Sequence, residues 1–323
     1  MSLYVKIWCL SMLLCAVLSL VIYCMAELRH SIIKKTYFLM LVTQVTAVLL
    51  SFLGVYNNTG WLKGIFIYCL MISPLAILGL YCILKVLKAQ YHVKIKDAVY
   101  VEETDYKKIV PSDGTKVYET KDLYIFFPEY RTINFVFEKL PKKSDQSITW
   151  LSGAAFQHEL LLNFSTGNIE GSFASGGRYY EGAPLDSAKK YGAFVFYDGH
   201  FAFCYDDPEA AVKKAADHGG DGFMQWIVIS DGKPEALRLT IIRDKCFRVL
   251  AELNGNLCII DVKKRINIRN LVGVLEKLGL SNALYLDMGA GWNYSWYRRT
   301  NGSIKMLFKL RLPWGKNWLV FRK

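Results

Sequence analysis

One acidic residue, Asp287, follows directly after an apolar run, Ala283 to Leu286, that predicts a buried strand. Glycines follow, where the backbone can turn sharply or approach a ligand closely, and then aromatic, amide and cationic side chains. A strand end with an acid, a glycine turn and aromatic faces is typical of a site for a sugar that carries a negative group. The alternative is an aromatic corner of the core, since most aromatic residues serve packing. The ligand-contacting residues expected beside Asp287 are Gly289, Gly291, Trp292, Asn293 and Trp296.

A second acid, Glu170, lies in the glycine-rich stretch Gly167 to Gly177. Two carboxylates in such loops are what a glycoside-cleaving site requires, so Asp287 and Glu170 are the candidate catalytic residues. Arg248 begins a predicted hairpin strand, and its guanidinium offers a fixed fork of donors to an anion. The alternative for Arg248 is a surface ion pair.

Other chemistries lack their sequence patterns. Gly289-Ala290-Gly291 begins like a dinucleotide fingerprint but has no third glycine, and no G-x-S-x-G, P-loop or H-E-x-x-H motif occurs. The histidines are scattered and the cysteines show no C-x-x-C spacing, so no metal site is predicted and no cofactor is identified. The net charge of +12 comes without a dense Lys/Arg run, which argues against a nucleic-acid partner.

Turn and capping patterns predict the elements that position these residues. Asp198-Gly199 and Asn254-Gly255 each separate two apolar runs and predict hairpins. Asp207-Pro208 predicts a helix start, and Asn267 predicts the cap of a helix over Ile268 to Leu278 that leads into the Asp287 strand. The sequence therefore predicts an α+β fold, with a linker and first strands over 88–149 and one domain over 150–323.

The N-terminal region is apolar. Three uncharged stretches, at about 7–26, 37–56 and 65–84, have the length that a bilayer core requires. They predict a three-helix transmembrane region over 1–87, a multi-pass integral membrane protein and the lipid bilayer as a partner. Lysines and arginines in the first link and after the third stretch place the following domain in the cytoplasm by the positive-inside rule.

The C-terminal part resembles the phosphodiester glycosidase family over about residues 150–323. The segment Asn282-Ala283-Leu284-Tyr285-Leu286-Asp287-Met288-Gly289-Ala290-Gly291-Trp292 is similar to the family's late strand-and-glycine motif. Arg248 followed by Asn254-Gly255 resembles the family's central arginine and hairpin, and Glu170-Gly171-Ser172-Phe173 resembles its first loop. Two departures stand out: Glu170 replaces an Asn, and Met288 and Trp292 replace a Gly and a Ser.

The resemblance implies a divergent, bacterial, membrane-anchored hydrolase that cleaves a sugar-1-phosphodiester bond in a cell-envelope glycan or lipid-linked sugar. It also implies an extracytoplasmic domain, against the charge rule. The altered loop residues leave open a non-catalytic module that binds a glycan or an anionic lipid on the same fold.

Overall fold

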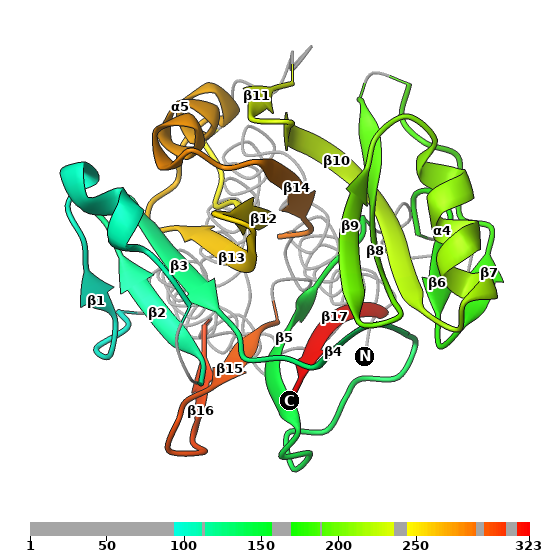
Figure 1. Cartoon of the computed structure of the whole chain (residues 1–323), viewed down its shortest axis with the longest axis horizontal. Helices are drawn as coiled ribbons and strands as arrows, with labels where there is room; N and C mark the ends of the chain where they lie inside the picture. Colours follow the sequence, from blue (N-terminus) through cyan, green and yellow to red (C-terminus); the bar gives the residue numbers. More distant parts are fainter. Residues whose placement is uncertain are drawn as a thin grey trace, which may run out of the picture. The chain divides into compact units, whose positions relative to one another are not determined.

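The computed structural model describes residues 94–111, 114–156, 169–187, 189–235, 244–288, 294–307 and 315–323 (Figure 1). The chain divides into two units, Met1–Ala89 and Gln90–Lys323, and all described residues belong to the second.

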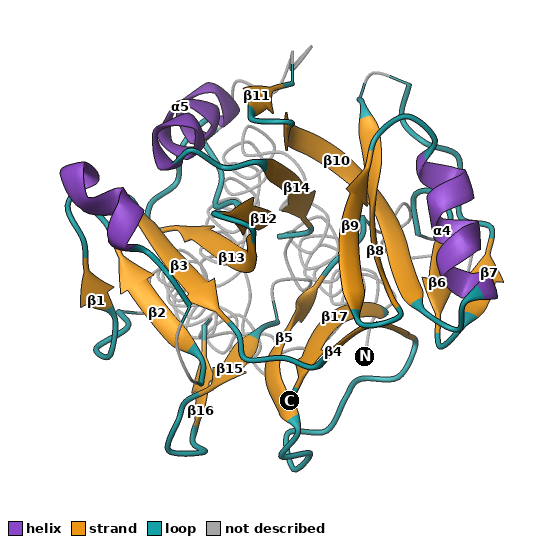
Figure 2. Ribbon diagram, viewed as in Figure 1, coloured by secondary structure: helices purple, strands orange, loops and turns teal. Residues whose placement is uncertain are grey.

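Strands dominate this unit, as Figure 2 shows. Within the described residues, a twelve-stranded sheet runs in the order β1-β2-β3-β13-β12-β14-β10-β6-β7, with β8 and β11 also paired to β10 and β9 paired to β8. The strands of this first sheet are β1 (Val99–Tyr100), β2 (Lys116–Glu119), β3 (Leu123–Phe127), β6 (Phe173–Ser175), β7 (Arg178–Tyr180), β8 (Tyr191–Tyr197), β9 (His200–Cys204), β10 (Asp221–Ser230), β11 (Lys233–Pro234), β12 (Arg248–Leu253), β13 (Asn256–Val262) and β14 (Asn282–Leu286).

A second sheet of five described strands runs in the order β16-β15-β5-β17-β4. Its strands are β4 (Thr132–Phe137), β5 (Ile148–Gly153), β15 (Trp296–Arg298), β16 (Ile304–Met306) and β17 (Asn317–Arg322). The described helices are the 3₁₀ helix η2 (Glu103–Lys108), α4 (Pro208–Asp217) and α5 (Ile268–Leu278).

Local chemistry explains several boundaries. Asp198 and Asn254 adopt positive φ angles of 52° and 52°, each followed by a glycine with positive φ, so the predicted β8–β9 and β12–β13 hairpins are confirmed. The Asp207 side chain accepts from the amide of Ala210 at the start of α4. Asn267 caps α5 in the same way, and Gly279 ends it with a left-handed φ of 70°.

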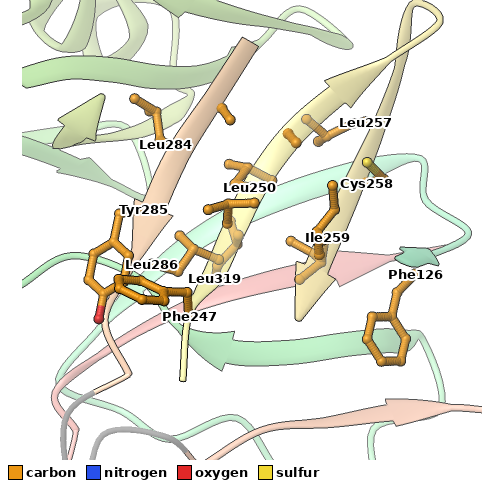
Figure 3. Close-up of a cluster of buried hydrophobic side chains, with 14 of the residues drawn as sticks. Phe126, Phe247, Leu250, Leu257, Cys258, Ile259, Leu284, Tyr285, Leu286 and Leu319 are labelled. Carbon is orange, nitrogen blue, oxygen red and sulfur yellow. The ribbon is translucent and has the colours of Figure 1, made fainter. Parts of the chain in front are cut away.

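The two sheets enclose a core. Phe126, Ile259, Leu250 and Leu284 lie opposite one another on β3, β13, β12 and β14, so their side chains share one face of the first sheet. Figure 3 shows these side chains in one buried cluster, together with Leu319 from β17 of the second sheet. The ring of Phe126 lies 4.9 Å from that of Trp150 on β5, which identifies this face as the one between the sheets.

The structure does not support the expected three-helix transmembrane region or the multi-pass membrane location. Across the described residues, no helix is long and apolar enough to cross a membrane. The longest described helix, α5, has 11 residues, whereas a span needs about 20. The predicted spans 7–26, 37–56 and 65–84 lie outside the described residues. The fold class is corrected to a strand-rich α+β architecture for the described part of the chain.

Candidate functional site

Asp287 follows β14, which lies between β12 and β10 in the first sheet. Its side chain is buried, and its backbone amide donates to the carbonyl oxygen of Ala154 at 2.9 Å. Ala154 comes directly after β5 of the second sheet. This backbone hydrogen bond therefore links the end of β14 to the point where the chain leaves the second sheet.

The three residues Ala154 to Phe156, which we name the crossover segment, connect both predicted catalytic acids. Ala154 binds the Asp287 amide, and the Phe156 carbonyl accepts from the backbone amide of Glu170 at 3.0 Å. Glu170 also forms a parallel bridge with Ala183. The backbone amides of two acidic residues that lie far apart in the sequence thus donate to carbonyl groups two residues apart.

The carboxylate of Glu170 is held by a tyrosine and a lysine. Tyr191 of β8 donates its hydroxyl to Glu170 Oε2 at 2.6 Å, and Lys189 Nζ lies 3.9 Å from the same oxygen. Burial, and then the Glu170 carboxylate, raise the pKa of Tyr191 above its ordinary value, so its hydroxyl stays a donor. Lys189 also lies 3.2 Å from Asp186 and 4.8 Å from the centre of the Phe156 ring.

Aromatic rings continue from Tyr191 toward β14. Tyr191 lies opposite Trp226 on β10, so both side chains share one face of the first sheet. The ring of Tyr285 lies 5.7 Å from Trp226 and 5.1 Å from Phe156, and Phe247 completes the group at 5.8 Å from Tyr285. Aromatic side chains near a carboxylate are a combination that a sugar-binding site uses, but Tyr191, Trp226, Phe247 and Tyr285 are all buried.

Arg248 occupies the other face of this sheet. It lies opposite Asp261 on β13 and Leu286 on β14, and its guanidinium lies 5.3 Å from the Trp150 ring. Nε and Nη2 donate to the two Asp261 oxygens at 2.6 Å each. The arginine is fully buried, so its ion pair belongs to the core and not to the surface. The register brings Arg248 near Asp287, but its donor fork holds a carboxylate of the protein.

The remaining predicted site residues fall into two groups. Trp296 is fully buried on β15, in a cluster with Leu151, Trp318 and Val320, so it packs the second sheet. Gly289, Gly291, Trp292 and Asn293 lie outside the described residues, and their roles stay predictions. Within the described part, no three His, Cys, Asp or Glu residues come together in a group that could hold a metal ion.

Sequence reasoning missed Lys189, Tyr191 and Phe156, which contact Glu170 or its surroundings. It also missed Gln225, whose Nε2 donates to the carbonyl of Ala154 at 3.1 Å. The sequence did offer a signal for Gln225, which is the one side-chain amide in the apolar strand β10. A buried polar group without a hydrogen-bond partner destabilises a fold, so such an amide is expected to have one. The signal for Lys189 and Tyr191 was a cation and a hydroxyl at the start of the predicted hairpin.

No protein-family model and no curated protein matches the sequence. Among solved structures, the chain is similar to the zebrafish N-acetylglucosamine-1-phosphodiester alpha-N-acetylglucosaminidase catalytic domain auto-inhibited by its pro-peptide. The match has a TM-score of 0.43 and 13% sequence identity, and it covers 62% of this chain and 76% of that chain. At this distance, the likeness assigns neither a fold family nor a substrate or activity.

Proposed function

We propose that this protein hydrolyses a sugar-1-phosphodiester bond, in a cell-envelope glycan or a lipid-linked sugar. One observation carries the proposal: Asp287 and Glu170 are bonded through their backbone amides to the same crossover segment. A pair of carboxylates around one position is what cleavage of a glycosidic bond requires.

The chemistry follows from the leaving group. When the bond between sugar C1 and oxygen breaks, a phosphate monoester leaves as a stable anion, so protonation of the leaving oxygen matters less. Stabilising positive charge on the sugar and activating water then matter more. We assign Asp287 to charge stabilisation at C1. Glu170 takes a proton from water while the oxygen of this water bonds to C1. The products are a free sugar and a phosphate monoester.

A cation that contacts Glu170 is Lys189, whose side chain is 18% exposed and lies against the Phe156 ring. An ammonium group that lies between two carboxylates can exchange its contact with one of them for a contact with a substrate phosphate. We therefore assign the phosphate to Lys189, because the donor fork of Arg248 holds Asp261.

A second candidate is a non-catalytic module that binds a glycan. The observation that favours it is the hydrogen bond of 2.6 Å that the Tyr191 hydroxyl donates to Glu170. This bond stabilises the charged carboxylate, which accepts it. In this reading, the aromatic rings and carboxylates recognise a sugar, and no bond breaks.

Replacing Asp287 by Asn tests the enzyme. The change preserves shape and the backbone bond to Ala154 but removes the negative charge, so turnover should fall by about a hundredfold or more. The full chain is incubated with a panel of sugar-1-phosphodiesters of p-nitrophenol, and a phosphatase reports the released nitrophenyl phosphate. In ¹⁸O-water and without the phosphatase, label should enter the sugar and not the nitrophenyl phosphate.

The matched control is Asp231→Asn, in the turn between β10 and β11. Asp231 has a φ of 50°, a conformation that asparagine also adopts readily. Its turnover should equal that of the unchanged protein. Equal turnover by Asp287→Asn, or label in the nitrophenyl phosphate formed without the phosphatase, would refute the assigned mechanism. Saturable binding of a glycan with no turnover on any substrate would favour the binding module.

A further inference from the structure

Asn317 begins β17 and is buried, and its amide makes three hydrogen bonds to the crossover segment. Its Oδ1 accepts from the backbone amides of Ala154 and Ala155 at 3.3 and 2.8 Å. Its Nδ2 donates to the carbonyl of Ala155 at 3.1 Å. One side chain therefore satisfies two donors and one acceptor of a segment that has left the sheet.

The strand register explains this role. β17 pairs with β5 up to Trp318 opposite Gly153, and no further pair follows toward Asn317. Beyond the last backbone pair, the side chain of Asn317 makes the hydrogen bonds to the crossover segment. The backbone of Asn317 itself pairs with Phe137 on β4, so the amide is anchored to the second sheet.

The first sheet holds the same segment from the other side. Gln225, fully buried on β10, donates to the Ala154 carbonyl, which also accepts from the Asp287 amide. Gln225 is fixed in turn, because its Oε1 accepts from the amide of Trp226 at 2.8 Å. Two buried amides from different sheets thus bind Ala154 and Ala155, the first two residues of the segment that accepts from the backbone amides of Asp287 and Glu170.

We propose that Asn317 is a positioning residue that sets the separation of Asp287 and Glu170 through the crossover segment, with Gln225 as its counterpart on the first sheet. The catalytic meaning of this inference rests on the proposed function. The mechanical part does not, because it concerns two backbone amides that exist with or without a substrate.

An amide is the side chain that this place requires. A carboxylate could accept from the amides of Ala154 and Ala155 but could not donate to the Ala155 carbonyl, and it would bring a charge into the core. Leu319 and Phe321, on the same face of β17, make only apolar contacts in the core cluster. Of these three residues, Asn317 is the one whose side chain bonds to the crossover segment.

The test is hydrogen–deuterium exchange of the full chain, followed by mass spectrometry of peptides that contain Glu170 and Asp287. Asn317→Ala should speed exchange at both amides by about tenfold or more, since local opening of the segment exposes them. Gln225→Met, which keeps the volume but loses the donor to Ala154, should speed exchange at Asp287 more than at Glu170. The control is Val320→Ala on the same strand, which removes two buried methyl groups on the face of β17 opposite to Asn317.

Unchanged exchange at Glu170 and Asp287 in folded Asn317→Ala, or an equal effect of Val320→Ala, would overturn the inference. Gln225→Met gives an independent test if Asn317→Ala does not fold. With a substrate in hand, Asn317→Ala should lower kcat by up to about a hundredfold while KM changes little, because misplacement acts on the reacting groups. If no substrate is turned over by the unchanged protein, yet exchange rises as expected, the proposed function fails while the positioning role stands.

Discussion

The pair Arg248–Asp261 and the group Glu170–Tyr191–Lys189 both join charged side chains within the first sheet and its loops, but their geometry differs. The guanidinium makes two contacts of 2.6 Å with one carboxylate and lies against Trp150 in the core. The ammonium of Lys189 lies 3.9 Å from Glu170 and also forms an ion pair with Asp186. A pair of the first kind stabilises a single arrangement, whereas a group of the second kind can exchange partners with a ligand.

The largest effect should come from breaking the buried pair. Asp261→Asn removes the negative charge to which Nε and Nη2 of Arg248 donate in the core, so the free energy of unfolding should fall by about 3–5 kcal/mol. Urea denaturation of the full chain, followed by tryptophan fluorescence, measures it. The double variant Arg248→Met with Asp261→Leu should recover most of the loss, since an apolar pair needs no counter-charge. A loss below about 1 kcal/mol in Asp261→Asn would show that the pair is not buried as described.

A smaller effect should come from the loop that carries Glu170. A Cβ atom added at Gly182 would lie 1.9 Å from the carbonyl oxygen of Gly171 and 2.5 Å from that of Ile169. Gly182→Ala must therefore displace the backbone around Glu170, at a cost of about 1–3 kcal/mol, and turnover should fall with it. Urea denaturation and the phosphodiester assay measure the two effects.

The matched control for Gly182→Ala is Gly273→Ala in α5. A Cβ atom at Gly273 meets nothing within 4 Å, and alanine is the better helix former, so this variant should gain up to about 1 kcal/mol. Turnover should stay unchanged. A Gly182→Ala protein as stable as the unchanged one would contradict the tight approach of these two segments.

The smallest effect should come from Tyr191→Phe, which removes the hydroxyl bonded to Glu170. Below pH 10 the loss should be about 1 kcal/mol, because water can partly replace the donor. The pKa of Tyr191 is raised in the folded protein, mainly by burial and then by Glu170. As the pH rises above 10.0, the ordinary value, the unfolded tyrosine ionises first and this residue's contribution to stability declines.

The difference in stability between the unchanged protein and Tyr191→Phe should therefore shrink between pH 10 and 11. Urea denaturation at a series of pH values measures it. Other tyrosines, such as the partly buried Tyr205 and the buried Tyr297, have raised pKa values and titrate in both proteins, so the comparison isolates Tyr191. A difference that grows above pH 10 would contradict the assigned shift.

Several features of the fold could be predicted because they depend on neighbours in the chain. Asn254-Gly255 forms the predicted hairpin turn, and Asn267 and Gly279 bound α5, since positive φ angles and free helix-end amides select these residue types locally. The expected transmembrane region came from apolar length alone. In the described residues, the same apolar character fills buried strands such as β10.

By itself, the sequence determined these turns and caps and the place of Asp287 at the end of a buried strand. Only the tertiary structure decided which partners the charged residues have. It paired Arg248 with Asp261, because β12 and β13 lie side by side in that register. It brought Glu170 and Asp287 to one crossover segment, because two sheets meet there and their buried amides must find partners. Such contacts depend on strand register and sheet packing, which short-range patterns do not encode.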